Sequence, residues 1–211
     1  MSKEIMSNGE YHSKKDYLSA SGLKKFAVSP AHYKHYIEQP VEETAALIFG
    51  SAVHALIEQN LTGEPVFDKE FFILNELDHF TEEELLQPNF RRKKEYQTWK
   101  KSTESDIRKP VDESVKFIVD KLFKSTFVKN TLLNMDNAEC EPSYFLDYQL
   151  QFIDNPGEVK LRTRPDYINH ELKYIVDYKT MRDEPTDDNC MKEIRYRYYW
   201  LQAALYTLIV N

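Results

Sequence analysis

The spacing of hydrophobic side chains changes near residue 135. Before that point apolar residues recur three and four positions apart, which is typical of amphipathic helices. The helical segments predicted from this spacing are 19–38, 43–59, 111–124 and a further short helix to about residue 134. Residues 81–107 are charged and irregular, and we expect helix with a mobile loop there. A strand is expected over Val66–Leu74.

Two features refine this helical region. Ser29 and Pro30 are expected to divide 19–38 into two short helices, because Ser29 suits an N-cap and Pro30 suits a first turn. Segment 43–59 is predicted to be amphipathic. The residues expected to share its apolar face are Leu47, Val53, Leu56 and Ile57.

After residue 135 the chain is rich in aromatic and branched side chains, which favours strands. The predicted strands are Glu141–Phe152, Val159–Ile168 and Lys173–Lys179, with turns at Asn155-Pro156-Gly157 and Asn169-His170. A long helix is expected over about 187–209. Helices, an antiparallel strand meander and a final helix together predict an α/β (α+β) fold. We expect one domain over 1–211, with a helical N-terminal part of about 1–135 and a strand-rich part of about 136–211.

Composition limits the classes of protein to consider. The 211 residues and a hydrophobic fraction of 41% suit one domain with a sizeable core. No apolar run is long enough to span a membrane, and the two cysteines, Cys140 and Cys190, lie far apart, so a cytoplasmic location is the simplest expectation. A net charge of −7 argues against a broad basic face, although a local grip on DNA is compatible with it. Arg195-Tyr196-Arg197 is the best local candidate, because basic and aromatic residues alternate there.

Candidate chemistry is concentrated in Arg164-Pro165-Asp166 and Asp177-Tyr178-Lys179. Asp177 and Lys179 are two apart on an expected strand, so they share one face. A tight turn near Asn169 would place Asp166 opposite Asp177. Two facing carboxylates repel each other unless a cation lies between them, and hard oxygen ligands suit Mg²⁺ or Mn²⁺. Lys179 would orient the attacking water and stabilise charge on a phosphate, whereas a plain Asp177–Lys179 ion pair is the alternative.

Four stretches in order resemble the RecE-type exonuclease (exodeoxyribonuclease VIII) family, within the RecB-like and lambda-exonuclease-like group of PD-(D/E)XK nucleases. The first is Leu18-Ser19-Ala20-Ser21-Gly22-Leu23-Lys24-Lys25-Phe26 with Ser29–Tyr33, and the second is Phe49-Gly50-Ser51-Ala52-Val53-His54. The third is Glu141-Pro142-Ser143 followed by Arg164-Pro165-Asp166 and Asp177-Tyr178-Lys179-Thr180. The fourth is Tyr199 with Gln202–Tyr206. The resemblance implies a restriction-endonuclease-like core with a mixed central sheet flanked by helices, and a helical N-terminal lobe.

The resemblance also implies roles for individual residues. The expected metal ligands are His54, Asp166, Asp177, Glu141 and the backbone carbonyl of Tyr178. The expected catalytic residues are Lys179, Asp177, Asp166 and Glu141, supported by the pair Gln202 and Tyr206 on one helix face. The expected DNA-binding residues are Arg164, Tyr199, Arg197, Ser19 and Ser21.

Several of these residues have simpler interpretations. A single histidine on an apolar helix, such as His54, is usually a core histidine. Glu139 is an alternative to Glu141. The simpler interpretation of Gln202 and Tyr206 is that they only pack a helix, and that of Ser19 and Ser21 is that they only cap one.

The implied activity is a Mg²⁺- or Mn²⁺-dependent 5′→3′ exonuclease on linear double-stranded DNA ends. It would leave 3′ single strands for an annealing or recombination protein in a bacterium or a phage-infected host. The family continues beyond the last helix, so an end at Asn211 suggests truncation, and a ring-shaped homo-oligomer is expected if the C-terminus is complete. The alternatives are a RecB-like nuclease of different substrate scope and a nuclease-fold DNA-binding or assembly module without activity. Two cysteines do not supply the four that an iron–sulfur nuclease of this fold needs.

Overall fold

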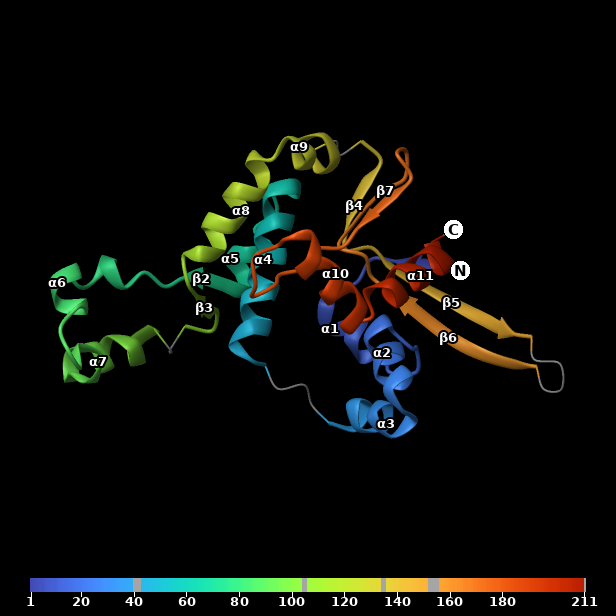
Figure 1. The fold of residues 1–211 in the computed structure, drawn as a ribbon, viewed down its shortest axis with the longest axis horizontal. Coiled ribbons are helices and arrows are strands. Elements are labelled where there is room, and N and C mark those ends of the chain that lie inside the picture. Colours follow the sequence, from blue (N-terminus) through green and yellow to red (C-terminus); the bar gives the residue numbers. More distant parts are fainter. Residues whose placement is uncertain (40–42, 104–105, 134–135, 152–155, 211) are drawn as a thin grey trace. The chain divides into compact units, whose positions relative to one another are not determined.

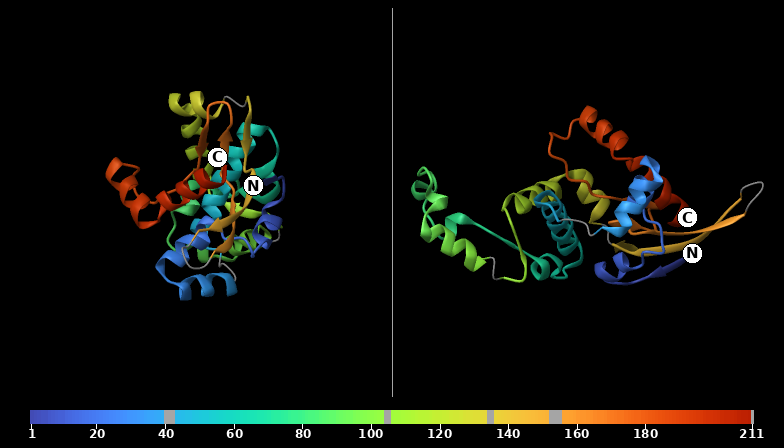
Figure 2. Two further views of the ribbon diagram at one scale, coloured as in Figure 1. Left: turned by 90° about the vertical axis from the view of Figure 1, so that its right-hand side faces the viewer. Right: turned by 90° about the horizontal axis from the view of Figure 1, so that it is seen from below.

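The computed structural model describes residues 1–39, 43–103, 106–133, 136–151 and 156–210. The chain divides into two compact units, the first formed by Met1–Glu42 with Met135–Asn211 and the second by Glu43–Asn134. Figure 1 shows the fold coloured along the sequence, and Figure 2 gives two further views.

The first unit combines short strands with helices from both ends of the chain. Its strands are β1 (Ser2–Glu4), β4 (Ala138–Cys140), β5 (Ser143–Leu150), β6 (Gly157–Thr163), β7 (Tyr167–Asn169) and β8 (Tyr174–Val176). Its helices are α1 (Asn8–Ser13), α2 (Ala20–Val28), α3 (Pro30–Glu38), α10 (Asp187–Tyr196) and α11 (Tyr199–Val210). The strands form two antiparallel sheets, β1-β5-β6 and β4-β7-β8.

Between β4 and β7 the chain changes sheets twice, and the two crossings meet. Between β4 and β5 it turns at Glu141, whose φ of 47° lies in the left-handed region. Between β6 and β7 it passes through Arg164-Pro165-Asp166, where buried Pro165 has no N–H to donate to a strand ladder. The Glu141 N–H donates to the Asp166 carbonyl over 3.0 Å, which joins one crossing to the other.

Helix α11 covers the sheet next to these crossings. Tyr144 of β5, Leu161 of β6 and Leu205 and Ile209 of α11 form a buried cluster. Helix α11 contacts β5, β6 and α2, so it joins the sheet to the N-terminal helices (Figures 1 and 2). The side chains of α11 that face the crossings are therefore fixed by the packing of the same helix on the core.

The two N-terminal helices divide at Ser29 and Pro30, as the sequence predicts. The Ser29 hydroxyl accepts a hydrogen bond from the His32 N–H, and Pro30 occupies the first turn of α3. Gly22 lets α2 and α3 approach, since a Cβ there would lie 2.9 Å from Leu18 Cδ1 and 3.2 Å from Tyr33 Cε2.

The second unit is built mainly from helices. Its elements are α4 (Ala45–Thr62), α5 (Val66–Glu70), β2 (Phe71–Ile73), η1 (Glu76–Asp78), α6 (Glu82–Leu85), η2 (Phe90–Arg92), α7 (Lys94–Thr103), β3 (Lys109–Val111), α8 (Ser114–Lys124) and α9 (Thr126–Leu132). The strands β2 and β3 pair in parallel, and α4 packs against α5 and α8.

Three local predictions in this unit need correction. Val66–Leu74 is not one strand, because its first five residues form α5 and only Phe71–Ile73 pair with β3. The helix expected from 111 begins at Ser114, since Val111 ends β3. On α4, Leu47 remains 50% exposed, whereas Val53 and Ile57 are buried. Residues 104–105 and 134, at the ends of two predicted helices, lie outside the described residues.

The strand and helix limits of the first unit also differ from prediction. The expected strand Val159–Ile168 is interrupted at the Arg164–Asp166 crossing, and the strand expected to reach Lys179 ends at Val176. The long final helix is two helices, because the chain turns at Tyr198, whose φ is 53°. Phe152 and Asn155, in a predicted strand end and turn, lie outside the described residues.

The mixed α/β fold class is confirmed, with the strands of the described residues distributed over three small sheets. Across the described ranges, every helix is too short or too polar to span a bilayer.

Candidate functional site

The β7–β8 hairpin brings the two predicted aspartates together. Its register pairs Tyr167 with Val176, so the next opposed positions beyond the ladder are Asp166 and Asp177. The turn is held by Asn169, whose side-chain oxygen accepts a hydrogen bond from the Leu172 N–H over 2.7 Å. The geometry therefore matches the facing carboxylates expected from the sequence.

Each aspartate is held by different donors. One Asp166 oxygen accepts the Tyr178 N–H over 2.5 Å. Asp177 Oδ1 accepts two hydrogen bonds of 2.8 Å, from Gln202 Nε2 and Tyr206 Oη, and Asp177 Oδ2 pairs with the Lys179 ammonium. The Asp177–Lys179 ion pair, which is the simpler interpretation of this motif, is thus present alongside the supporting donors.

Gln202 and Tyr206 project from one face of α11, as their spacing of four predicts. Gln202 Nε2 also donates to Tyr206 Oη over 2.5 Å, and the Tyr206 hydroxyl in turn donates its hydrogen bond to Asp177 Oδ1. Burial raises the pKa of Tyr206, and the Asp177 charge raises it further. The phenol is therefore neutral and acts as a donor.

Lys24 of α2 completes this network, and sequence reasoning did not select it. Its ammonium donates to Gln202 Oε1 over 2.6 Å and lies 4.7 Å from the centre of the Tyr199 ring. Burial lowers the pKa of Lys24 to about 8, with a further lowering by the Lys179 charge. Lys24 lies inside the N-terminal stretch that carries the resemblance, but no local pattern distinguishes it from Lys25.

Glu141 and Arg164 occupy the two sheet crossings. Arg164 Nε lies 3.2 Å from Glu141 Oε2 and donates to the Glu141 carbonyl over 3.0 Å, while Nη2 donates to the Met6 carbonyl. The Arg164 side chain is only 14% exposed, so its observed contacts hold the crossing. DNA binding by Arg164 stays a prediction.

Glu139 lies on β4 and has other partners. Its carboxylate pairs with Lys3 and His170, each over 2.8 Å. The Glu139 side chain is thus held by Lys3 and His170, whereas the Glu141 backbone bonds to Asp166, and the choice of Glu141 over Glu139 for the site stays a prediction.

The remaining predicted residues lie at separate positions. Ser19 caps α2 by accepting the Gly22 N–H, and Ser21 is exposed on the same helix. Arg197 is exposed and pairs with Glu193 over 2.9 Å. His54 is half-buried on α4, in the second unit, and its role as a metal ligand stays a prediction.

The donor set fits a hard divalent cation. Asp166, Asp177 and Glu141 offer carboxylate oxygens, and the Tyr178 carbonyl lies 3.3 Å from Lys179 Nζ. Within the ranges that the structure describes, no three His, Cys, Asp or Glu side chains are gathered as a ready-made cage. Mg²⁺ is typically held by one or two carboxylates with water completing its shell, so the opposed pair suits it.

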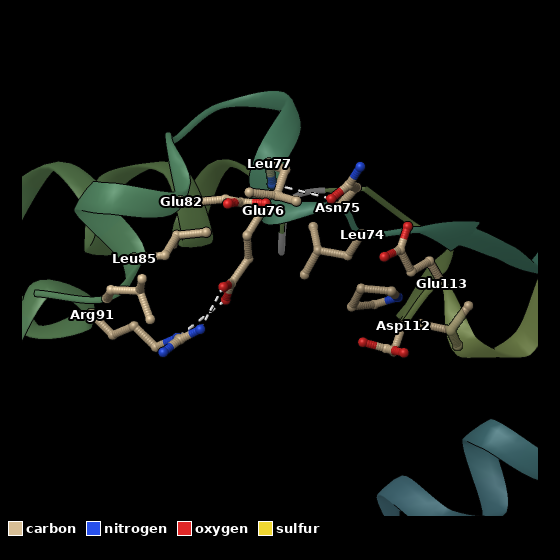
Figure 3. Close-up of a pocket in the computed structure, with 12 residues that line it drawn as sticks. Leu74, Asn75, Glu76, Leu77, Glu82, Leu85, Arg91, Asp112 and Glu113 are labelled. Carbon is tan, nitrogen blue, oxygen red and sulfur yellow. Dashed lines mark hydrogen bonds and ion pairs between the residues drawn. The ribbon is translucent and has the colours of Figure 1, made fainter.

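The second unit contains a cleft of about 640 Å³ with a different composition. Figure 3 shows leucines and acidic side chains around it, with Glu76 joined to Arg91. All of its lining residues lie between Leu74 and Glu113, and none is a predicted site residue.

Comparison with known proteins identifies the family. A search of curated proteins found no match. Residues 19–211 match the family described as PDDEXK-like domain of unknown function (DUF3799). The match supports the PD-(D/E)XK part of the resemblance and a nuclease-type fold, whereas membership of the RecE-type family stays a prediction. The match includes the hairpin, the crossings and α11, and the chain therefore belongs to this PDDEXK-like family.

Proposed function

We propose that the protein is a metal-dependent deoxyribonuclease that hydrolyses phosphodiester bonds at the β7–β8 hairpin. The observation that carries this proposal is the environment of Asp177. Two neutral donors fix one of its oxygens, the Lys179 ammonium meets the other, and Asp166 faces it. A carboxylate held for packing alone does not need a second carboxylate opposite it, because like charges across strands repel.

A bound divalent cation would be held by Asp166, Asp177 and the Tyr178 carbonyl, with Glu141 acting directly or through water. The cation would supply a Lewis acid for the phosphate and a lower pKa for the attacking water. Gln202 and Tyr206 keep the Asp177 carboxylate in one orientation. Lys179 leaves its ion pair to orient the water and to stabilise negative charge on the phosphate.

DNA is the substrate class that the local charges suit best. Lys179 lies 5.4 Å from the centre of the Tyr199 ring, which gives an ammonium group and an aromatic face beside the hairpin. Such a combination suits phosphates with neighbouring bases. A grip limited to this region is compatible with a net charge of −7.

The finer activity proposed is 5′→3′ digestion of linear duplex DNA that leaves 3′ single strands for an annealing or recombination protein. Mg²⁺ or Mn²⁺ would serve as the cofactor, and a ring-shaped homo-oligomer would make digestion processive. These features rest on the four-stretch resemblance to RecE-type exonucleases. The residues expected to bind the DNA end are Arg164, Tyr199, Arg197, Ser19 and Ser21. Of these, Arg197 and Ser21 are exposed and the other three are partly buried.

The test is nucleotide release from a blunt linear duplex labelled at either 5′ or 3′ ends, with Mg²⁺, Mn²⁺ or EDTA. Early loss of the 5′ label, absent with EDTA and in Lys179→Ala, is expected. Lys192→Ala, which removes an exposed lysine of α10, is the matched control and should digest normally.

Other results would redirect the proposal. Internal cuts or digestion of single strands only would indicate a RecB-like nuclease of different substrate scope. Retained DNA binding without release under any metal condition would contradict catalysis and favour a DNA-binding or assembly module.

A further inference from the structure

The side-chain amide of Gln202 has two ends with opposite hydrogen-bonding character. Its NH₂ group only donates and its oxygen only accepts. In the observed orientation the NH₂ group serves Asp177 Oδ1 and Tyr206 Oη, and the oxygen accepts from Lys24. A flipped amide would place its oxygen against the Asp177 carboxylate and its NH₂ group against an ammonium.

We propose that Lys24 is a positioning residue whose ammonium fixes the Gln202 amide in the orientation that donates to Asp177. The inference rests on the proposed nuclease function for its catalytic consequence. Its structural part, the locked amide, stands on the contacts alone. The chain of hydrogen bonds runs from Lys24 through Gln202 to Asp177, over distances of 2.6 and 2.8 Å.

The surroundings of Lys24 disfavour a charged ammonium. Its ammonium is partly removed from water and feels the like charge of Lys179, and both effects oppose its protonated form. The described interactions that compensate are those with the Gln202 amide oxygen, the Tyr199 ring and the negative charge of Asp177. Packing of α2 against the core is supplied instead by Ala20 and Leu23.

Lys24 also joins two distant parts of the sequence. The residue lies 178 positions before Gln202, and α2 packs against α11. The N-terminal stretch is therefore required for the orientation of a side chain that meets the hairpin carboxylate. Lys25, next along α2, is exposed and offers a control of the same residue type.

A double-mutant cycle tests the catalytic consequence. Lys24→Met keeps the apolar stem and removes the donor, Gln202→Leu removes the amide, and Lys25→Met is the control. Lys24→Met is expected to lower kcat about tenfold or more, the range for a lost hydrogen bond to a charged group, with KM nearly unchanged. The double variant should be no slower than Gln202→Leu. Additive losses, or a raised KM with weaker salt dependence, would overturn the inference and indicate a direct phosphate contact.

An NMR measurement tests the locked amide without any activity. The Gln202 side-chain ¹⁵N–¹H₂ pair is identified by its loss in Gln202→Leu. In Lys24→Met this pair should shift or broaden as the amide samples both orientations, while Lys25→Met leaves it unchanged. An unaltered pair in Lys24→Met would refute the positioning role. An inactive wild type with the expected NMR change would count against the nuclease proposal alone.

Discussion

Two carboxylates of this chain meet a cation and a tyrosine hydroxyl, and they illustrate different uses of similar contacts. In the second unit, Glu76 accepts Arg91 Nη2 over 2.7 Å and Tyr96 Oη over 2.5 Å. In the first unit, Asp177 pairs with Lys179 and accepts Tyr206 Oη over 2.8 Å. The residue types are nearly the same, so the type of contact alone does not identify a functional site.

The difference lies in how the cation binds the oxygens of each carboxylate. Arg91 engages both oxygens of Glu76 with its rigid planar fork, so one cation holds the two oxygens together. Lys179 is a point charge on a flexible stem and engages one oxygen of Asp177, opposite a second carboxylate, Asp166. An ion pair that can open beside a like charge suits chemistry, whereas a closed fork suits structure.

The comparison is tested most strongly by Asp177→Asn. Nucleotide release in Mg²⁺ is expected to fall by about a thousandfold or more, because the amide cannot serve as an anionic metal ligand. Asp147→Asn, on exposed strand surface, is the control and should digest normally. An Asp177→Asn enzyme of near wild-type rate would place the chemistry elsewhere.

The next effect expected is that of Lys179→Arg. The fork of arginine would hold Asp177 in the closed manner of Glu76, and single-turnover hydrolysis should fall about a hundredfold. The affinity for DNA, measured by fluorescence anisotropy, should change little because the positive charge is kept. Full activity in this variant would contradict the distinction between an opening and a closed ion pair.

A smaller effect is expected for the two tyrosines. Tyr206→Phe should lower kcat about tenfold, since it removes one hydrogen bond to the Asp177 carboxylate. Tyr96→Phe removes the corresponding hydroxyl from Glu76 and should leave kcat unchanged. Equal losses of activity in both variants would show that the two carboxylates are functionally alike.

The smallest effect is a pH-dependent change in stability from Glu76→Gln. Hydrogen bonds from Arg91 and then Tyr96 lower the pKa of Glu76. A lowered pKa in the folded state stabilises the protein at pH values above the ordinary pKa of glutamate. This contribution is lost as the pH falls through the lowered pKa. Thermal unfolding should therefore give a Tm for Glu76→Gln slightly below wild type at neutral pH and equal to it in acid. A difference that grows toward acid pH would reverse the assigned sign.

The hairpin at the centre of the site could be predicted from local sequence. The turn at Asn169 and the two-residue strand period are sufficient to place Asp166 opposite Asp177. The end of β8 at Val176 was not predicted. It is set by the partner strand β7, which begins at Tyr167, directly after the chain crosses between sheets. Local propensity carries no information about that limit.

Residues joined over long sequence distances required other signals. Gln202 and Tyr206 were selected through the family resemblance, and a four-residue spacing explains only their shared helix face. Lys24 was missed because its selection depends on the packing of α2 against α11. Val66–Leu74 failed for a different reason, since its short apolar pattern suits either a helix or a strand.

The turn that joins β7 to β8 also limits how this hairpin can change in evolution. One residue inserted within β8 before Asp177 would turn the following side chains to the opposite face of the strand. Two inserted residues would restore the face but move Asp177 two positions along the strand from the place opposite Asp166. Insertions and deletions between positions 167 and 177 should therefore be selected against, because the register of this ladder sets Asp166 opposite Asp177.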